Sequence, residues 1–410
     1  MRILFLTYGL PHPMNSGARI RDAALLRHTA GRHRTALLSL LECPEEARHL
    51  PSLRAFCDPV RAVAQRPRTA IEHAEGLTQA LIRHRPLATH PFFYPELAAI
   101  LRRAVASWRP DILQIEHSFL APYVGAIPPA GRPRTILSFH NIGARQYRRM
   151  LRLQTGPFET GLFFLKWLVM LRWETRAARA FDHCITVSES ERQWLRKRSP
   201  GLPVTVIENG VDTKRLRPLA DAGPGNVLVF VGTMGYPPNV DAVLHFHDRI
   251  LPRIRERVPD ARLLVVGRSP APALERLAFT GGITLTGDVP DPVPYYAGAR
   301  VCVVPLRGGG GTRLKILESM ALGKPVVSTS LGCEGLQVRH GEEILVADAP
   351  REFARSVANL LESPALRHRI STQARDLVEH RYDWSRIGEG LLGLYERIAG
   401  KPPQPETGRS

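Results

Sequence analysis

Short apolar runs that alternate with helical patterns constrain the fold of this chain more than any other feature. In the first half the strand-like runs are Arg2–Tyr8, Thr35–Leu41, Ile112–Glu116, Thr135–Phe139 and His183–Ser188. In the second half they are Val204–Glu208, Val227–Gly232, Arg262–Gly267, Ile283–Gly287, Arg300–Pro305 and Pro325–Ser328. Continuous apolar strands between helices indicate parallel sheets covered on both faces. The pattern therefore predicts an α/β chain with two doubly wound, Rossmann-like domains.

The length of the chain, 410 residues, also favours two domains over one core. An Asn-Gly turn at 209–210 and the polar, proline-containing stretch after it suggest the boundary. We expect a first domain over 1–205, a second over 206–380, a helix within 381–400 and a disordered tail over 401–410. The helix should be amphipathic, with one apolar side formed by Trp384, Ile387, Leu391, Leu394 and Ile398.

A glycine-rich turn in the second half, within the sequence VCVVPLRGGGGTRLKILE at 301–318, carries the clearest chemistry. A buried strand that ends in glycines and restarts as a helix forms an anion site, because backbone N–H groups and the helix dipole point at the ligand. Arg313 and Lys315 add charge there, and the carboxylate of Glu318 suits ribose hydroxyls. The alternative is a flexible connector, but four consecutive glycines are costly in conformational entropy. The pattern favours a nucleotide diphosphate.

The net charge of +18 is unevenly distributed. Residues 1–218 contain 33 Lys and Arg against 17 Asp and Glu, whereas the rest contains 23 against 21. The first half is therefore expected to meet an anionic partner: nucleic acid, a phosphate-rich acceptor or an anionic membrane. No apolar run approaches the roughly 18 residues of a membrane span. Five dispersed cysteines indicate reduced thiols in the cytosol and no zinc site; Cys184 and Cys302 lie in strand patterns and should be core residues.

The segment Gly161–Phe181 has two interpretations that the sequence leaves open. Its apolar residues cover more than one face of a helix, and arginines flank it. It is either a buried domain helix or an interfacial helix that contacts an anionic membrane beside Arg145, Arg148, Arg149 and Arg152.

A series of motifs in a fixed order resembles a known family. The motifs are SGAR (16–19), FHN (139–141), VSESE (187–191), ENGVD (208–212), FVGTMGYPPNVDAV (230–243), LLVVGRSP, LTGDVPD and LKILESMALGKPVVST. Together they resemble the GT-B-fold, retaining glycosyltransferases of the family 4 type. Within that family the chain is most similar to sugar transferases of bacterial exopolysaccharide clusters.

The resemblance implies a fold and a function. The two Rossmann-like domains would face each other across a central cleft, the first binding the acceptor and the second the nucleotide sugar, with the final helix crossing back to the first domain. The partners would be a nucleotide sugar and a glycan or polyprenyl-diphosphate-linked acceptor. No cofactor or metal is expected, and the chain lacks an Asp-x-Asp motif. The protein would work in the cytoplasm, with peripheral contact at the inner face of the membrane.

The resemblance also assigns residues that bind the donor. Glu318 matches the second glutamate of an E-x7-E motif, which binds the ribose, and Lys315 matches a lysine that faces the phosphates. Asp288 and Val289 match the loop beside the nucleobase. For Glu318, the alternative is a first-turn glutamate favoured by the helix dipole.

Around the diphosphate and the sugar, His140 matches a histidine near the donor, and Gly17 matches a glycine that brings amides towards the diphosphate. We expect His140, Lys315 and Arg313 to be catalytic, with the backbone of Gly310, Gly311 and Thr312 stabilising the leaving diphosphate. No carboxylate nucleophile is expected. The alternative for His140 is a hydrogen-bonded structural residue at a strand end, but its position after an apolar strand in the FHN motif favours a role in the cleft. Asn209 is either a turn former or part of the cleft lining.

Two departures from the family pattern affect this site. Gly310 stands where the first glutamate of E-x7-E is expected, so that a backbone amide or Arg307 would have to replace it. Gly232 and Thr233 are also expected to bind the donor, in a loop where relatives carry an arginine and a lysine at the positions of Thr233 and Asn239. A diphosphate in a closed site needs compensating charge, and Arg313 and Lys315 are the nearest sources.

Two other function classes remain. A nucleotide-sugar epimerase or hydrolase on the same fold would turn over the nucleotide sugar without an acceptor. A nucleic-acid-binding protein is suggested by charge alone, since no basic-aromatic platform or binding motif supports it. We therefore expect no nucleic-acid partner.

Overall fold

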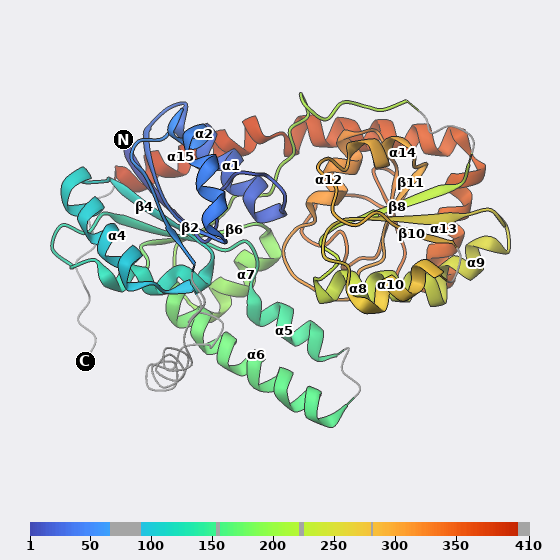
Figure 1. Cartoon of the computed structure of the whole chain (residues 1–410), viewed down its shortest axis with the longest axis horizontal. Helices are drawn as coiled ribbons and strands as arrows, with labels where there is room; N and C mark the ends of the chain where they lie inside the picture. The colour runs from blue at the N-terminus through green and yellow to red at the C-terminus, as the bar shows by residue number, and fades with distance from the viewer. Residues whose placement is uncertain (66–91, 153–155, 221–224, 280–281, 401–410) are drawn as a thin grey trace. The chain divides into compact units, whose positions relative to one another are not determined.

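A computed structural model describes residues 1–65, 92–152, 156–220, 225–279 and 282–400. The predicted disordered tail, 401–410, lies outside the described residues. The chain divides into two compact units, which are described separately. The first unit contains Met1–Glu208 and the segment that begins at Ile387; the second contains Asn209–Arg386 (Figure 1).

The first unit is built on a seven-stranded parallel sheet of order β3-β2-β1-β4-β5-β6-β7. The strands are β1 Arg2–Thr7, β2 Arg34–Leu41, β3 Val60–Ala64, β4 Ile112–Glu116, β5 Arg134–Ser138, β6 His183–Thr186 and β7 Val204–Val206. All neighbours run parallel, so their carboxyl ends meet at one edge, where ligands of such sheets bind. The pairing of Glu116 with Ser138 places the ends of β4 and β5 side by side.

Helices cover both faces of this sheet (Figure 1). They are α1 Gly17–Ala30, α2 Leu50–Arg54, α4 Pro95–Trp108, α5 Gly143–Leu151, α6 Pro157–Ala178, α7 Glu189–Arg198 and α15 Trp384–Ala399, with the 3-10 helices η1 Pro44–His49 and η3 Ser118–Ala126. On one face Leu97 and Leu101 of α4 belong to the same buried apolar cluster as Leu113 and Ile115 of β4. The neighbouring residues of β4, Gln114 and Glu116, belong to the opposite face and are buried there as polar groups.

The second unit is built on a six-stranded parallel sheet of order β10-β9-β8-β11-β12-β13. Its strands are β8 Val227–Val231, β9 Arg262–Val266, β10 Ile283–Leu285, β11 Val301–Val304, β12 Val326–Ser328 and β13 Leu345–Val346. Its α-helices are α8 Pro237–His245, α9 Leu251–Arg255, α10 Pro272–Glu275, α11 Val293–Ala297, α12 Leu314–Ala321, α13 Pro350–Glu362 and α14 Pro364–Leu377. It also has two π-helical segments, η4 Phe246–Ile250 and η6 Val378–Tyr382, and a 3-10 helix, η5 Arg276–Phe279. Helices α12 and α14 lie on one side of the sheet and α8 and α10 on the other (Figure 1).

One strand assignment from the sequence is wrong. The run Val204–Glu208 was predicted to open the second half, but Val204–Val206 pairs with β6 and closes the first sheet. A strand shows its own period but not its partner, so the sequence could not allocate it to a sheet. The strands β3 and β13 were not predicted; β13 is only two residues long and has no period to detect.

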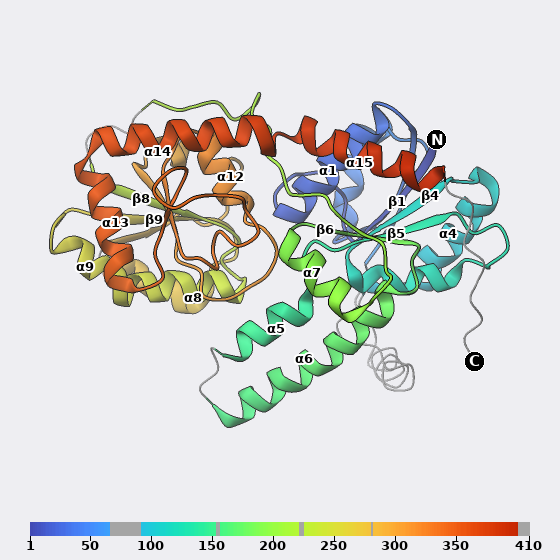
Figure 2. The same ribbon diagram turned by 180° about the vertical axis from the view of Figure 1, so that it is seen from behind.

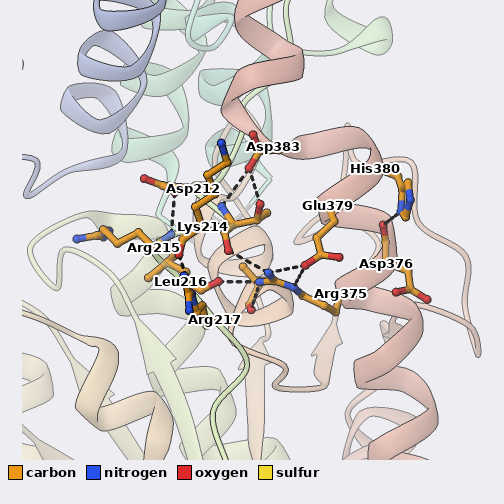
Figure 3. Close-up of polar contacts among 12 residues, drawn as sticks. Asp212, Lys214, Arg215, Leu216, Arg217, Arg375, Asp376, Glu379, His380 and Asp383 are labelled. Atoms are coloured by element: carbon orange, nitrogen blue, oxygen red, sulfur yellow. Dashed lines mark hydrogen bonds and ion pairs between the residues drawn. The ribbon is translucent and has the colours of Figure 1, made fainter.

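The polypeptide that enters the second unit is held against that unit's own helices (Figure 3). The guanidinium of Arg375 on α14 donates to the carbonyl oxygens of Leu216 at 2.6 Å and Thr213 at 2.9 Å, and to that of Ala321 at the end of α12. The same arginine forms an ion pair with Glu379. One side chain therefore fixes the entering segment, α12 and α14 together.

The C-terminal amphipathic helix predicted within 381–400 is confirmed as α15. All five residues of its predicted apolar side are buried. Cys184 and Cys302 are buried free thiols, as expected for core residues.

Candidate functional site

A buried charged cluster lies where β4 and β5 of the first unit end. His140, two residues after β5, places Nε2 at 2.8 Å from Oε2 of Glu116 and 3.2 Å from Oδ1 of Asp22. Glu116 ends β4, and Asp22 comes from the second turn of α1; both carboxylates are buried. The sequence singled out His140 but neither carboxylate, because only the packing of α1 against two strand ends brings them together.

The charges in this cluster raise the pKa of His140. Burial alone would lower the pKa of His140, but the carboxylates of Asp22 and Glu116 outweigh it and raise that pKa. Burial acts to raise the pKa of Glu116, whereas His140 and Arg21 together lower it. An imidazolium held between two carboxylates through Nε2 keeps Nδ1 as its other donor, which suits an anionic or hydroxyl oxygen of a ligand.

His117 is a second histidine of this cluster, and the sequence analysis missed it. Its ring lies 3.7 Å from that of His140, centroid to centroid, and its φ of 76° is unusual for a residue other than glycine. Burial, His140 and Arg21 lower the pKa of His117 well below 6.5. Its position directly after the strand that ends at Glu116 was the available signal.

Three residues of the cluster have the types and spacing of metal ligands. Asp22, His117 and His140 each offer a ligand atom within 4.8 Å of the others, and zinc binds such groups. A metal at Nε2 of His140 would have to displace the proton that the two carboxylates hold there. The expectation that the protein needs no metal therefore stays a prediction.

A chain of hydrogen bonds connects α15 to His140. The hydroxyl of Tyr395 donates to Oε1 of Gln114 at 2.7 Å, and Nε2 of Gln114 donates to Oε1 of Glu116 at 2.5 Å. The other oxygen of Glu116 contacts His140. Because Tyr395, Gln114 and Glu116 are buried, this chain orients the carboxylate that orients His140.

The predicted residue Gly17 is exposed at the start of α1, where Ser16 is the N-cap. One turn further, the buried guanidinium of Arg21 donates to the carbonyl oxygens of Ile207 and Glu208, each at 2.8 Å. α1 therefore offers free backbone amides at an exposed end and is fixed to the end of the first unit by a buried arginine.

In the second unit, the predicted glycine turn connects β11 to α12. Gly309 and Gly311 adopt φ values of 103° and 72°, which other residues rarely adopt. Arg313 is the N-cap residue of α12, and its guanidinium donates to the carbonyl oxygens of Gly310 and Gly308. Arg313 thus stabilises its own loop, with its charge beside the helix N-terminus.

Lys315 is positioned by the loop that follows β8. Its Nζ donates to Oδ1 of Asn239 at 3.1 Å and lies 4.1 Å from the centre of the Phe230 ring. Nδ2 of Asn239 donates to the carbonyl of Thr233 at 2.9 Å. A Cβ atom on Gly232 would lie 2.8 Å from Nζ of Lys315 and 2.8 Å from Nδ2 of Asn239, so a larger residue there would displace both side chains. Thr233 and Asn239, the two residues that differ from the family pattern, therefore hold the ammonium of Lys315 in position.

The ammonium of Lys315 has no carboxylate within ion-pair distance among the described residues. Burial, with a smaller contribution from the charge of Arg313, lowers the pKa of Lys315 to about 7. An unpaired, partly buried cation beside a helix N-terminus is a destabilised group that an anion would stabilise.

Glu318 lies one turn beyond Lys315 and is half-buried. Burial raises its pKa, and Asp291 adds to that effect, whereas Arg215 and Lys315 oppose it. The predicted nucleobase residues Asp288, which is exposed, and Val289, which is half-buried, follow β10. Within that loop, Asp291 is the residue whose charge acts on Glu318.

Asn209 has a function that the sequence analysis did not foresee. Its Nδ2 donates to Oγ1 of Thr312 at 2.7 Å, and both residues are buried. This hydrogen bond therefore holds the end of the glycine turn in place. Arg307, considered as a substitute for the glutamate missing at Gly310, forms a two-point ion pair with Asp241, with contacts of 2.6 and 3.1 Å. A direct role in sugar binding would require that pair to open.

Two family models match the chain. Residues 46–215 match the model described as Glycosyltransferase Family 4, and residues 225–363 match that described as Glycosyl transferases group 1. The phosphatidyl-myo-inositol mannosyltransferase of Mycolicibacterium smegmatis is 30% identical over 226 residues, 53% of this chain and 57% of the relative. A 44.6 kDa protein in the cps region of Klebsiella pneumoniae is 24% identical over 63% of this chain and 67% of the relative. The chain thus spans little more than half of its mannosyltransferase relatives.

Solved structures share the fold over nearly the whole chain. Sucrose-phosphate synthase from Thermosynechococcus elongatus has a TM-score of 0.73 at 18% identity and covers 97% of this chain and 99% of its own. The HepE protein of Anabaena, in complex with UDP, has a TM-score of 0.68 at 16% identity, covering 97% and 100%. These likenesses confirm the GT-B fold expected from the sequence.

Proposed function

Because the chain belongs to the GT-B glycosyltransferases, with a family 4 domain followed by a group 1 domain, we propose that it is a retaining glycosyltransferase. It moves a sugar from a nucleotide-diphosphate sugar to a glycan or a polyprenyl-diphosphate-linked acceptor. The second unit binds the donor and the first unit the acceptor. The product belongs to a bacterial exopolysaccharide or another cell-surface polysaccharide.

The observation that carries this proposal is the position of Lys315. It lies at the first turn of α12, against the backbone of Gly232, without a carboxylate partner among the described residues. In a sugar transferase the departing group is a nucleoside diphosphate, and preorganised positive charge on that group stabilises the transition state. Lys315, Arg313 and the amides of Gly310–Thr312 supply this charge, and Glu318 binds the ribose.

His140 has a complementary role in the proposed reaction. Asp22 and Glu116 raise the pKa of its imidazole, and in the protonated ring Nδ1 donates to an oxygen of the donor sugar or the diphosphate. The exposed amides at Gly17 add partial positive charge at the N-terminus of α1. No carboxylate nucleophile is needed, because the leaving phosphate accepts the acceptor's proton on the same face of the sugar.

Basic groups in both units replace a metal ion in this proposal, and no cofactor is required. The donor is a cytoplasmic metabolite, and the free thiols of the chain fit that compartment. We therefore place the reaction in the cytoplasm, with the acceptor presented at the inner face of the cell membrane.

A thermal-shift panel of nucleotides and nucleotide sugars, with magnesium or with a chelator, tests the proposal. UDP and UDP-glucose are suitable first probes, since HepE was solved with each. A ligand at about 100 times its Kd should stabilise the protein by roughly 2.7 kcal/mol. Chelation should leave the shift unchanged.

Variants locate the binding to this site. Lys315→Ala should weaken nucleotide binding by about 10- to 100-fold, the usual cost of a lost charged hydrogen bond. Lys214→Ala, at an exposed lysine of the same unit, is the matched control. Unchanged affinity in Lys315→Ala would disprove the assignment, and turnover of the nucleotide sugar without an acceptor would indicate an epimerase or hydrolase instead.

A further inference from the structure

Helix α6 combines two parts with opposite surroundings. In its second part, Met170, Trp173, Ala177 and Ala178 are buried in the core of the first unit. Its first part runs away from the sheet beside α5 (Figure 2), and nearly all residues over 157–166 are exposed. The two interpretations of Gly161–Phe181 therefore apply to different parts of one helix.

The exposed part carries a stripe of large apolar side chains. Phe158 is 77% exposed, Leu162 40% and Leu165 58%. At 100° per residue, these three positions fall within about 60° of one another on the helix surface. Inward-facing residues such as Phe163, 6.2 Å from Tyr147 of α5 between ring centroids, lie on another side. The stripe is therefore a surface that α5 and α6 do not use to pack against each other.

Basic residues continue the same line along α6 towards the body of the unit. Arg172 and Arg176 are exposed and lie on the helix side that carries the stripe. Over 143–152 and 156–179, which include α5 and α6, there are eight Lys and Arg against two Asp and Glu. One of those two acidic residues, Glu174, is buried and accepts hydrogen bonds from the amides of Gly143 and Ala144.

The basic end of this line opens into a hollow of about 460 Å³ on the first unit. Its lining residues are Leu171, Arg172, Thr175, Arg176, Arg179 and Arg198. None of them is acidic. Burial and the nearby charges of Arg148 and Arg145 lower the pKa of Arg198, which shows how crowded the positive charge is. A hollow lined by four arginines suits phosphate groups.

We propose that this surface docks on a membrane rich in anionic phospholipids. The stripe Phe158–Leu162–Leu165 enters the acyl boundary, and the four arginines of the hollow bind lipid phosphates at the headgroup level. The stripe extends along about 10 Å of helix, and interfacial helices bury such an apolar face in the boundary between headgroups and acyl chains. In the part of the chain that the structure describes, no helix is long and apolar enough to span a bilayer.

The chemistry of the surface favours this occupant over two others. A second copy of the chain would bring the same eight basic residues against these eight, and the repulsion would oppose pairing. A nucleic acid would neutralise the arginines but would leave the phenylalanine and the leucines in contact with water and phosphate. Only an anionic bilayer offers negative charge and hydrocarbon at adjacent depths.

Vesicle co-sedimentation of the full chain tests the proposal. Vesicles of phosphatidylcholine alone should bind weakly, and vesicles with equal parts of phosphatidylcholine and phosphatidylglycerol should bind strongly. Binding should fall between about 0.1 M and about 1 M salt, because the Debye length shrinks from about 10 to 3 Å. Equal binding to both vesicle types, or binding to neither, would overturn the proposal.

Matched variants separate the contributions of charge and stripe. Arg172→Gln with Arg176→Gln should reduce binding to anionic vesicles by about 30-fold, since each basic residue near such a surface contributes about fivefold. The control is Arg351→Gln with Arg355→Gln, two exposed arginines four residues apart on α13, and it should bind as the parent does. An equal loss in both pairs would show that only the overall charge matters.

Phe158→Ser with Leu162→Ser and Leu165→Ser should weaken vesicle binding while leaving the Tm unchanged, because the three side chains are exposed. If these changes instead abolish a dimer seen by light scattering and leave vesicle binding intact, the stripe is a protein interface and the proposal is wrong. All variants should bind nucleotides as the parent does, so a failure here is distinct from a failure of the proposed activity.

Discussion

Nε2 of His140 lies 2.8 Å from Oε2 of Glu116, at the ends of two neighbouring parallel strands. The pair is buried, and a buried imidazolium is stable only beside negative charge. Asp22 and Glu116 together therefore raise the pKa of a histidine that the family resemblance alone would treat as an isolated ligand contact.

Replacing Glu116 by Gln should lower the pKa of His140. In the parent protein the folded pKa is raised above 6.5, so the stability that His140 contributes is complete below pH 6.5 and is lost as pH rises through the folded pKa. In Glu116→Gln, this loss of stability should be smaller. NMR titration of the His140 ring and Tm measured against pH check both effects; an unchanged titration would contradict the role of Glu116.

Tyr395→Phe should act on His140 from a distance. The change removes the hydroxyl that donates to Gln114 and leaves a buried acceptor unsatisfied, at a cost of about 1–3 kcal/mol in unfolding free energy. The His140 titration should also shift, since Gln114 orients Glu116. A stability loss without any shift would show that Tyr395 only packs α15.

Lys315→Met should make the protein more stable while it abolishes tight nucleotide binding. The folded pKa of Lys315 is about 7 against 10.5 for an ordinary lysine, so the unfolded chain binds more protons between these values and the lysine destabilises the fold. The gain in Tm should be largest below pH 7 and vanish near pH 10.5. Calorimetry against pH measures it; a lower Tm in the variant would contradict the low pKa.

Affinity for UDP-glucose should fall as pH rises above 7. The protonated form of Lys315 binds the diphosphate, and above its free-site pKa of about 7 a proton must be taken up on binding. The decrease is at most about tenfold per pH unit. Titration calorimetry in two buffers of different ionisation enthalpy detects the proton uptake, and Lys315→Met should show none. A pH-independent affinity in the parent would disprove the coupling.

Asn209→Ala and Thr312→Val should be coupled. Their buried hydrogen bond of 2.7 Å joins the entry of the second unit to the glycine turn, so each change alone should destabilise by about 1–3 kcal/mol and the pair by less than the sum. Urea unfolding of the two single variants and the double variant measures the coupling. Asn226→Ala, whose amide binds the exposed Asp260, should cost less.

The limits of most strands could be predicted from the pattern of neighbouring residues. Ile112–Glu116 was predicted with its observed limits, and β1, β2, β8 and β9 within one residue at each end. The assignment of the β7 run to the second half was wrong because pairing with β6 depends on the partner strand. The predicted roles of Gly17, Gly232, Thr233, Asp288, Val289 and Glu318 in donor binding stay predictions.

The sequence by itself determined the α/β alternation, the glycine turn and the amphipathic last helix, because period and turn chemistry are written in neighbouring residues. The tertiary structure decided which polar groups meet. Glu116 and His140 are 24 residues apart and Gln114 and Tyr395 are 281 apart, and Asn239 reaches Lys315 from another loop. Such contacts depend on the order of strands in a sheet and on the packing of helices against it, which no local pattern encodes.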